Sequence, residues 1–159
     1  MKVLTVLVPT YNVEKYLRRC LDSLLLPEVL EEIEVLVVND GSKDGSADIA
    51  RAYEKKYPQT VVFVDKENGG HGSTINVGIE KAQGTYFKVL DSDDWVNIGD
   101  FIEFVKRLKE ETADAVICDY RKEHVYNGKS EYFEYKDLED GKKYNLNEID
   151  LNICLLYTS

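Results

Sequence analysis

The sequence is poor in cysteine and in basic residues, and it contains no long apolar run. Its three cysteines, Cys20, Cys118 and Cys154, show no CxxC spacing, which favours reduced, buried thiols over a disulfide framework or a zinc site. The net charge of −10 argues against nucleic acid as a partner, because binding to phosphates needs a basic face. The longest apolar runs, such as residues 35–38, are far too short to span a bilayer.

The rest of the composition is that of an ordinary globular protein. A chain of 159 residues, with 43% hydrophobic and 31% charged residues, is long enough to bury a core and has the size of one domain. Residues 1–4 lead directly into a strand-like segment without a cleavage site, so the sequence predicts no signal peptide. These features predict a cytoplasmic protein with no membrane span in this stretch.

Hydrophobic periodicity alternates between strand-like and helix-like segments along the first 118 residues. Five short apolar runs predict buried strands at residues 3–8, 33–38, 61–64, 85–90 and 113–118. Apolar residues at helical spacing lie between these runs, and Asn12 is the expected N-cap of the first helix. This βαβαβαβαβ order predicts an α/β fold, with a mostly parallel, Rossmann-like sheet and helices on both of its faces.

The pattern changes in residues 119–159. Asn127-Gly128 lies between two aromatic-rich runs, which predicts a β-hairpin with a tight turn. Residues 151–159 are apolar and end without a closing element, so we expect the sequence to be truncated at its C-terminus. We therefore divide the chain into residues 1–118 and an incomplete second region that begins at residue 119.

A polar, turn-rich segment follows each of the first four predicted strands. These segments are residues 9–12, 39–42, 65–68 and 91–94. In open α/β sheets, ligands bind outside the carboxyl ends of the strands, so the four segments are expected to line one crevice. The acidic side chains that we expect at this crevice are Asp40, Asp91, Asp93 and Asp94.

Clustered carboxylates repel one another, so a site that contains several of them usually binds a cation. Oxygen ligands suit Mg²⁺ or Mn²⁺ rather than zinc, and such an ion can stabilise charge on a phosphate leaving group. The alternative is that residues 91–94 cap the next helix and that Asp40 belongs to a turn. Residues 68–72 form either a phosphate-binding loop or a flexible connection, and His71 is either a phosphate contact or a solvated loop residue.

Five short motifs occur in order, each at a predicted strand end or helix start. They are Val8-Pro9-Thr10-Tyr11-Asn12, Val38-Asn39-Asp40-Gly41-Ser42, Asn68-Gly69-Gly70, Asn76-Val77-Gly78 and Leu90-Asp91-Ser92-Asp93-Asp94. Together they resemble the family 2 glycosyltransferases over roughly residues 3–118. The resemblance implies a GT-A fold, in which a nucleotide-sugar-binding half precedes an acceptor-binding half.

The same resemblance implies a reaction and its partners. A sugar would pass from a nucleoside diphosphate sugar, with UDP-sugars favoured, to a glycan, lipid or protein acceptor. Transfer would proceed with inversion at the anomeric carbon and with Mn²⁺ or Mg²⁺ as the cofactor. The implied process is the biosynthesis of cell-envelope polysaccharide.

The resemblance also implies roles for individual residues. The implied nucleotide-sugar-binding residues are Pro9, Thr10, Tyr11, Asp40, Asn68, Asn76, Asp91 and Ser92. Residues 9–11 would line the nucleoside pocket, Asp40 would bind the base and Asp91 would lie near the ribose. Asp93 would ligate the metal ion together with Asp91, and Asp94 would support their loop.

This sequence departs from the family pattern in two ways. Many members carry Ala-Arg-Asn where residues 74–76 read Thr-Ile-Asn, so a cationic donor contact is missing, and His71 or Lys43 would have to replace it. The family's catalytic base is a carboxylate in the acceptor half, which we expect beyond Ser159. The alternative function is therefore a nucleotide- or metal-binding module without transferase activity. A dinucleotide-binding domain is disfavoured, because the sequence after the first strand lacks Gly-x-Gly-x-x-Gly.

Overall fold

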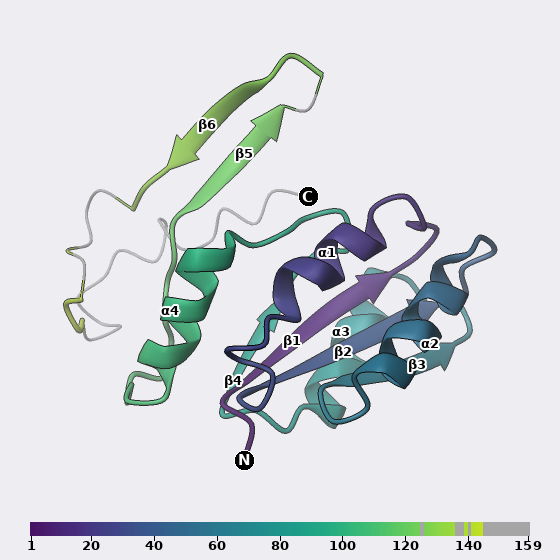
Figure 1. Cartoon of the computed structure of the whole chain (residues 1–159), viewed down its shortest axis with the longest axis horizontal. Coiled ribbons are helices and arrows are strands. Elements are labelled where there is room, and N and C mark those ends of the chain that lie inside the picture. Colours follow the sequence, from purple (N-terminus) through teal and green to yellow (C-terminus); the bar gives the residue numbers. More distant parts are fainter. Residues whose placement is uncertain (125, 136–138, 140, 145–159) are drawn as a thin grey trace. The chain divides into compact units, whose positions relative to one another are not determined.

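The computed structural model describes residues 1–124, 126–135, 139 and 141–144. The chain divides into two compact units, Met1–Glu111 and Thr112–Ser159. Within the described residues, each unit has its own sheet, with four strands in the first and two in the second (Figure 1).

The sheet of the first unit is entirely parallel. Its strands are β1 (Leu4–Thr10), β2 (Ile33–Asp40), β3 (Val61–Lys66) and β4 (Tyr86–Val89), in the spatial order β3-β2-β1-β4. Every residue of the two central strands, β1 and β2, is buried. This burial explains why both strands read as near-continuous apolar runs, the pattern expected for a parallel sheet that is covered on both faces.

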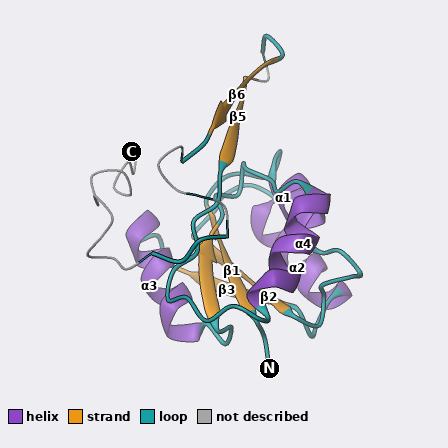
Figure 2. Cartoon of the chain, turned by 90° about the vertical axis from the view of Figure 1, so that its left-hand side faces the viewer, coloured by secondary structure: helices purple, strands orange, loops and turns teal. Residues whose placement is uncertain are grey.

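Helices cover both faces of this sheet (Figure 2). One face packs against α1 (Leu17–Leu24), α2 (Ser46–Lys56) and α4 (Ile98–Leu108), and the other against α3 (His71–Lys81). The α/β prediction, with a parallel sheet between helices, is therefore confirmed.

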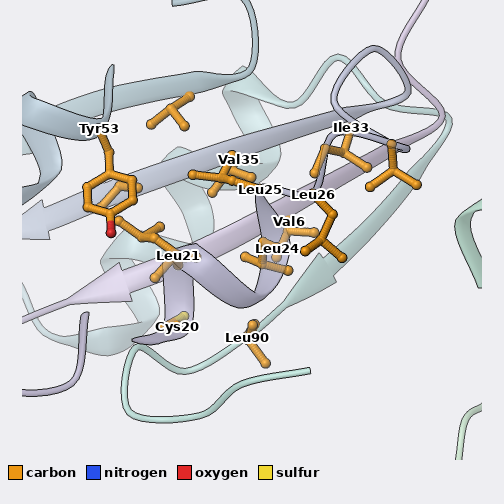
Figure 3. Close-up of a cluster of buried hydrophobic side chains, with 14 of the residues drawn as sticks. Val6, Cys20, Leu21, Leu24, Leu25, Leu26, Ile33, Val35, Tyr53 and Leu90 are labelled. Atoms are coloured by element: carbon orange, nitrogen blue, oxygen red, sulfur yellow. The ribbon is translucent and has the colours of Figure 1, made fainter. Parts of the chain in front are cut away.

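The larger part of the core lies between the sheet and α1, α2 and α4. Val6 and Val35 point from the central strands toward Leu21 and Leu24 of α1, and Tyr53 of α2 closes one end (Figure 3). The smaller part, on the α3 side, contains Leu7, Leu36 and Val38. Alternate residues of β1 and β2 thus supply the two cores, as the two-residue period of a strand requires.

The second unit contains a β-hairpin. Strand β5 (Tyr120–His124) pairs antiparallel with β6 (Lys129–Phe133). Gly128 has a φ of 66°, the left-handed conformation that favours glycine, but Asn127 does not share it, so these two residues do not form the tight type I′ turn that Asn-Gly predicts. The rings of Tyr120 and Phe133 stack with centroids 4.7 Å apart. The predicted hairpin is confirmed.

Three sequence predictions differ from the structure. Residues 113–118 form none of the strands that the structure describes; a short apolar run by itself does not distinguish a strand from other structure. Cys118 is exposed, whereas Cys20 is buried as predicted; Cys154 lies outside the described residues. Asn12 does not cap the first helix, which begins at Leu17.

No helix among the described residues combines the length and the apolar character needed to cross a membrane.

Candidate functional site

A cavity of about 550 Å³ opens at the carboxyl ends of the strands in the first unit. Eight residues that the sequence singled out line it: Pro9, Thr10, Tyr11, Asp40, Asn68, Asp91, Ser92 and Asp93. Four more residues complete its wall: Val13, Gly70, His71 and Thr74. The structure thus brings together residues as far apart in the sequence as Pro9 and Asp93, because the loops that follow parallel strands lie at one edge of the sheet.

Two predicted residues do not line this cavity. Asn76 is exposed on α3, and the cavity-lining residue of that helix is Thr74, two positions earlier. Two residues correspond to about 200° of rotation around a helix axis, so the two side chains point in different directions. Asp94 is also outside the lining, although it neighbours Asp93 in the chain.

The loop after β1 is fixed by the loop that follows β2. Asn12 adopts a φ of 53°, and its Oδ1 accepts a hydrogen bond of 2.8 Å from the backbone N–H of Lys43. The backbone N–H of Asn12 donates to Ser42 Oγ at 3.0 Å. This cross-link explains why Asn12 is left-handed rather than a helix cap, since Asn tolerates that conformation better than most residues. It also fixes Tyr11, which is 49% exposed at the cavity.

Asp40 ends β2 and is 4% exposed. Its carboxylate accepts hydrogen bonds from the backbone N–H groups of Gly69 at 2.9 Å and Gly70 at 2.8 Å, and it pairs with Lys66 Nζ. Burial raises the pKa of this carboxyl, but the bonds from Lys66, Gly69 and Gly70 outweigh burial and leave the pKa below its ordinary value. Asp40 is therefore an ionised, acceptor-only group at the cavity wall.

The acidic loop, residues 91–94, is held in place by α1. The Cys20 thiol donates to the Asp91 carbonyl with an S···O distance of 3.8 Å, and Ser23 Oγ accepts from the backbone N–H of Val96 at 3.2 Å. The Arg19 guanidinium lies 3.3 Å from the ring centroid of Trp95. Three contacts from one helix thus fix both the acidic loop and the two residues after it.

Helix capping does not account for the acidic loop. The N-cap of α4 is Asn97, whose side chain accepts from the backbone N–H groups of Gly99 and Asp100. The carboxylates of Asp91 and Asp93 instead line the cavity. Desolvation raises the pKa of the neighbouring Asp94 carboxyl, and the negative charges of Asp93 and Asp91 raise it further. This mutual repulsion is the electrostatic condition that favours a bound cation.

The donor set for such a cation is incomplete within the protein. In the part of the chain that the structure describes, no three His, Cys, Asp or Glu side chains are grouped so that they could hold a metal ion by themselves. Besides Asp40, whose carboxylate is engaged by Lys66 and the glycine-rich loop, the acidic residues at the cavity are Asp91 and Asp93. Because Mg²⁺ usually binds through one or two carboxylates plus phosphate oxygens and water, this set fits an ion that is held jointly with a diphosphate.

Position 75, where the resemblance led us to expect an arginine, is an isoleucine whose side chain lies in an apolar environment. Ile75 packs against Leu7 and the rest of the small core on the α3 side of the sheet. Of the two side chains that the sequence offered as substitutes, His71 lines the cavity and Lys43 does not. His71 is therefore the substitute that the cavity brings near a ligand.

Comparison with known proteins places the chain in a family. A family model described as "Glycosyl transferase family 2" matches residues 5–154. The chain is 41% identical over 126 residues to a putative glycosyltransferase, EpsH, of Bacillus subtilis (strain 168), an alignment that covers 79% of this chain and 36% of EpsH. The chain thus spans about a third of the length of this relative.

Solved structures agree with this assignment. The S. aureus TarS 1–349 structure in complex with UDP-GlcNAc is similar to this chain, with a TM-score of 0.59 and 34% identity over 69% of this chain and 32% of TarS 1–349. The mannosyltransferase PcManGT from Pyrobaculum calidifontis, in complex with GDP-Man and Mn²⁺, has a TM-score of 0.58 and 27% identity over 65% of this chain and 31% of its own. Fold, sequence motifs and family match coincide, and the chain belongs to glycosyl transferase family 2.

Proposed function

We propose that this chain is the donor-binding part of an inverting glycosyltransferase that uses a nucleoside diphosphate sugar. The observation that carries the proposal is the single cavity in which Asp40, Asp91 and Asp93 meet at the carboxyl ends of β2 and β4. In this proposal residues 1–118 bind the donor and residues 119–159 begin the acceptor side. TarS was solved with UDP-GlcNAc, and this complex supports a UDP-sugar as the donor.

The cavity offers a different chemistry at each wall. Tyr11, which is half exposed, and the neighbouring Pro9 supply apolar surface for a nucleoside. Asp40 supplies an ionised acceptor for an N–H group of a base, while Asp91 and Ser92 supply acceptors for ribose hydroxyls. Thr10 and Asn68 also line the cavity, and we assign them no separate contact with the donor.

Asp93 and Asp91 are the residues proposed to hold Mn²⁺ or Mg²⁺ together with the donor diphosphate. When bound, the ion supplies positive charge that stabilises the departing nucleoside diphosphate. The Mn²⁺ in the PcManGT complex supports this choice of cofactor. The chain's own contribution is to hold the acidic loop against α1. Cys20 bonds to the Asp91 carbonyl, while Arg19 and Ser23 contact Trp95 and Val96, the two residues that follow the loop.

The proposed chemical step is a direct displacement. An acceptor hydroxyl oxygen attacks the anomeric carbon as the bond to the diphosphate oxygen breaks, and the hydroxyl proton passes to a general base. We assign that base to no described residue. A glycan, a lipid and a protein remain the predicted classes of acceptor.

Calorimetric titration tests the donor site directly. UDP is titrated into the chain with Mn²⁺ and again with EDTA, and the measurement is repeated with Asp93→Ala. Asp48→Ala is the matched control, because Asp48 lies on α2 with a side chain that is 89% exposed. We expect Mn²⁺-dependent binding that is lost in Asp93→Ala and kept in the control.

Two results would contradict the proposal. If UDP, GDP and dTDP all fail to bind in the presence of Mn²⁺, the chain has no donor site of the proposed kind. If UDP binds equally well with EDTA and to Asp93→Ala, the acidic loop does not hold the cation. Binding without sugar transfer in a longer chain that contains the acceptor half would favour the alternative of a binding module.

A further inference from the structure

Lys66 bonds to Asp40, a residue of the cavity wall. It is the last residue of β3 and the register partner of Asp40, the last residue of β2. Its Nζ bonds to Asp40 Oδ1, to the Glu67 carbonyl at 2.6 Å and to Ser73 Oγ at 2.8 Å. One ammonium group therefore joins the ends of two strands to the first turn of α3, using all three of its donors.

The same lysine encloses the glycine-rich loop. Gly69 and Gly70 donate their N–H groups to Asp40, and Ser73 Oγ donates to the Gly70 carbonyl at 2.7 Å. A Cβ at Gly69 would lie 2.8 Å from Ser73 Oγ and 3.1 Å from Lys66 Nζ, so the loop packs directly onto the lysine. Part of this loop lines the cavity, and its shape there depends on the network around Lys66.

The network also determines what Asp40 can still accept. A carboxylate offers about four lone-pair positions, and Lys66, Gly69 and Gly70 fill three of those on Asp40. Two of the three bonds go to Oδ1 and one to Oδ2, so the remaining position is on Oδ2. Because Lys66 compensates the buried negative charge, Asp40 stays ionised and presents one acceptor rather than a donor.

We propose that Lys66 is a positioning and specificity-determining residue of the nucleotide site. It holds Asp40 as an ionised acceptor with one vacant lone pair, and it fixes the cavity-lining part of the glycine-rich loop. With N3 of the base facing Asp40, the site then favours uracil, whose N3–H is a donor, over cytosine, whose N3 is an acceptor. This inference rests on the proposed function, and it adds a residue that the sequence motifs did not include.

The test compares Lys66→Met with Lys55→Met, which removes the same charge from an exposed position on α2. Calorimetry gives the Kd for UDP with Mn²⁺, and NMR gives the amide exchange rates of Gly69 and Gly70 without nucleotide. We expect the Kd of Lys66→Met to rise at least about tenfold and both amides to exchange faster. Lys55→Met is expected to match the wild type. Ser73→Ala, a milder change in the same network, gives smaller effects in the same direction and replaces Lys66→Met if that variant does not fold.

A pH series distinguishes positioning of Asp40 from a general loosening of the fold. Without Lys66 the pKa of Asp40 rises, so the ratio of the two Kd values, Lys66→Met over wild type, should grow as pH falls from 7.5 to 5.0. The other titratable groups that line the cavity, His71, Asp91 and Asp93, are present in both proteins, so their titration cancels in the ratio to first order. In the wild type UDP should bind more tightly than CDP, and Lys66→Met should narrow this difference.

The outcomes separate this inference from the proposed function. If Lys66→Met and Lys55→Met have the same Kd and the same Gly69 and Gly70 exchange rates, the inference is overturned. A pH-independent ratio with an unchanged UDP preference overturns it as well. If the wild type binds no nucleoside diphosphate, the proposed function fails, and the exchange rates still decide whether Lys66 positions the loop.

Discussion

Replacing Gly84 with alanine should destabilise the first unit severely, because Gly84 lies against the backbone of β1. A Cβ at this position would be 2.4 Å from the Thr5 nitrogen, 2.7 Å from the Leu4 carbonyl carbon and 2.8 Å from Thr5 Oγ1. Two of these atoms belong to the backbone of a central strand that is paired on both sides, so they cannot move aside locally. The hydrogen bond from the Gly84 N–H to Thr5 Oγ1, 2.8 Å long, is also lost when the segments separate.

We expect Gly84→Ala to lower the free energy of unfolding by about 3 kcal/mol or more, the upper range for overpacking a closely packed site. Urea denaturation followed by far-UV circular dichroism measures this change. Gly99→Ala is the control, because a Cβ there meets one atom, Asn97 Oδ1, at an ordinary 3.7 Å. In the helix α4 the added methyl group should stabilise by about 0.5–1 kcal/mol. If the free energy of unfolding of Gly84→Ala lies within about 1 kcal/mol of the wild-type value, the packing argument is refuted.

Three further predictions concern Cys20, Asp40 and Arg19. Burial raises the pKa of the Cys20 thiol to about 12, with a smaller contribution from the negative charges of the acidic loop. The thiol should therefore resist alkylation by iodoacetamide at pH 8.5 in the native protein and react in urea. Rapid alkylation of the native protein would contradict this prediction. The raised pKa also means that stability should fall as pH rises above the unfolded thiol value near 9. Asp40→Asn should lower the free energy of unfolding by about 3 kcal/mol at pH 7, because Lys66 loses its counterion. The pKa of Asp40 is lowered in the folded state, so the difference in stability between the two proteins should shrink as acid protonates Asp40 in the wild type. A difference that stays constant down to pH 3 would contradict the assigned ion pair. Arg19→Ala should lower the free energy of unfolding, measured by urea denaturation, by about 0.5–1 kcal/mol, because the contact with the Trp95 ring is lost. The same variant should bind UDP more weakly in the presence of Mn²⁺. Unchanged binding would show that this contact does not position the acidic loop.

Much of the fold could be predicted because short apolar runs alternate along the chain with segments of helical periodicity. The fully buried strands β1 and β2 read as unbroken apolar runs, and the polar residues at their ends marked the site. The crevice rule then placed Asp40, Asp91 and Asp93 together without any distance information. The family resemblance added the roles, and seven of its eight nucleotide-sugar-binding residues line one cavity.

The cap predicted at Asn12 and the capping alternative for the acidic loop failed for different physical reasons. The conformation of Asn12 depends on a hydrogen bond to Lys43, which lies 31 residues away in the chain. The local sequence, which predicted a helix cap at Asn12, contains no sign of this contact. The capping reading of the acidic loop failed because Asn97 caps α4 instead. The contacts of Lys66 were not visible in the sequence, because a lysine after an apolar run looks like any solvated strand end.

Trp95 is the single tryptophan of the chain, and its place beside the acidic loop makes it an intrinsic optical probe. Its emission reports on the ring that lies beneath the Arg19 guanidinium, one residue after Asp94. A ligand that shifts this loop changes the environment of the only indole in the molecule, and no tyrosine is excited at 295 nm to obscure it. The chain therefore carries a label-free fluorescence reporter at the position where the cation is proposed to bind, suited to stopped-flow kinetics and to screens of metal ions and nucleotides.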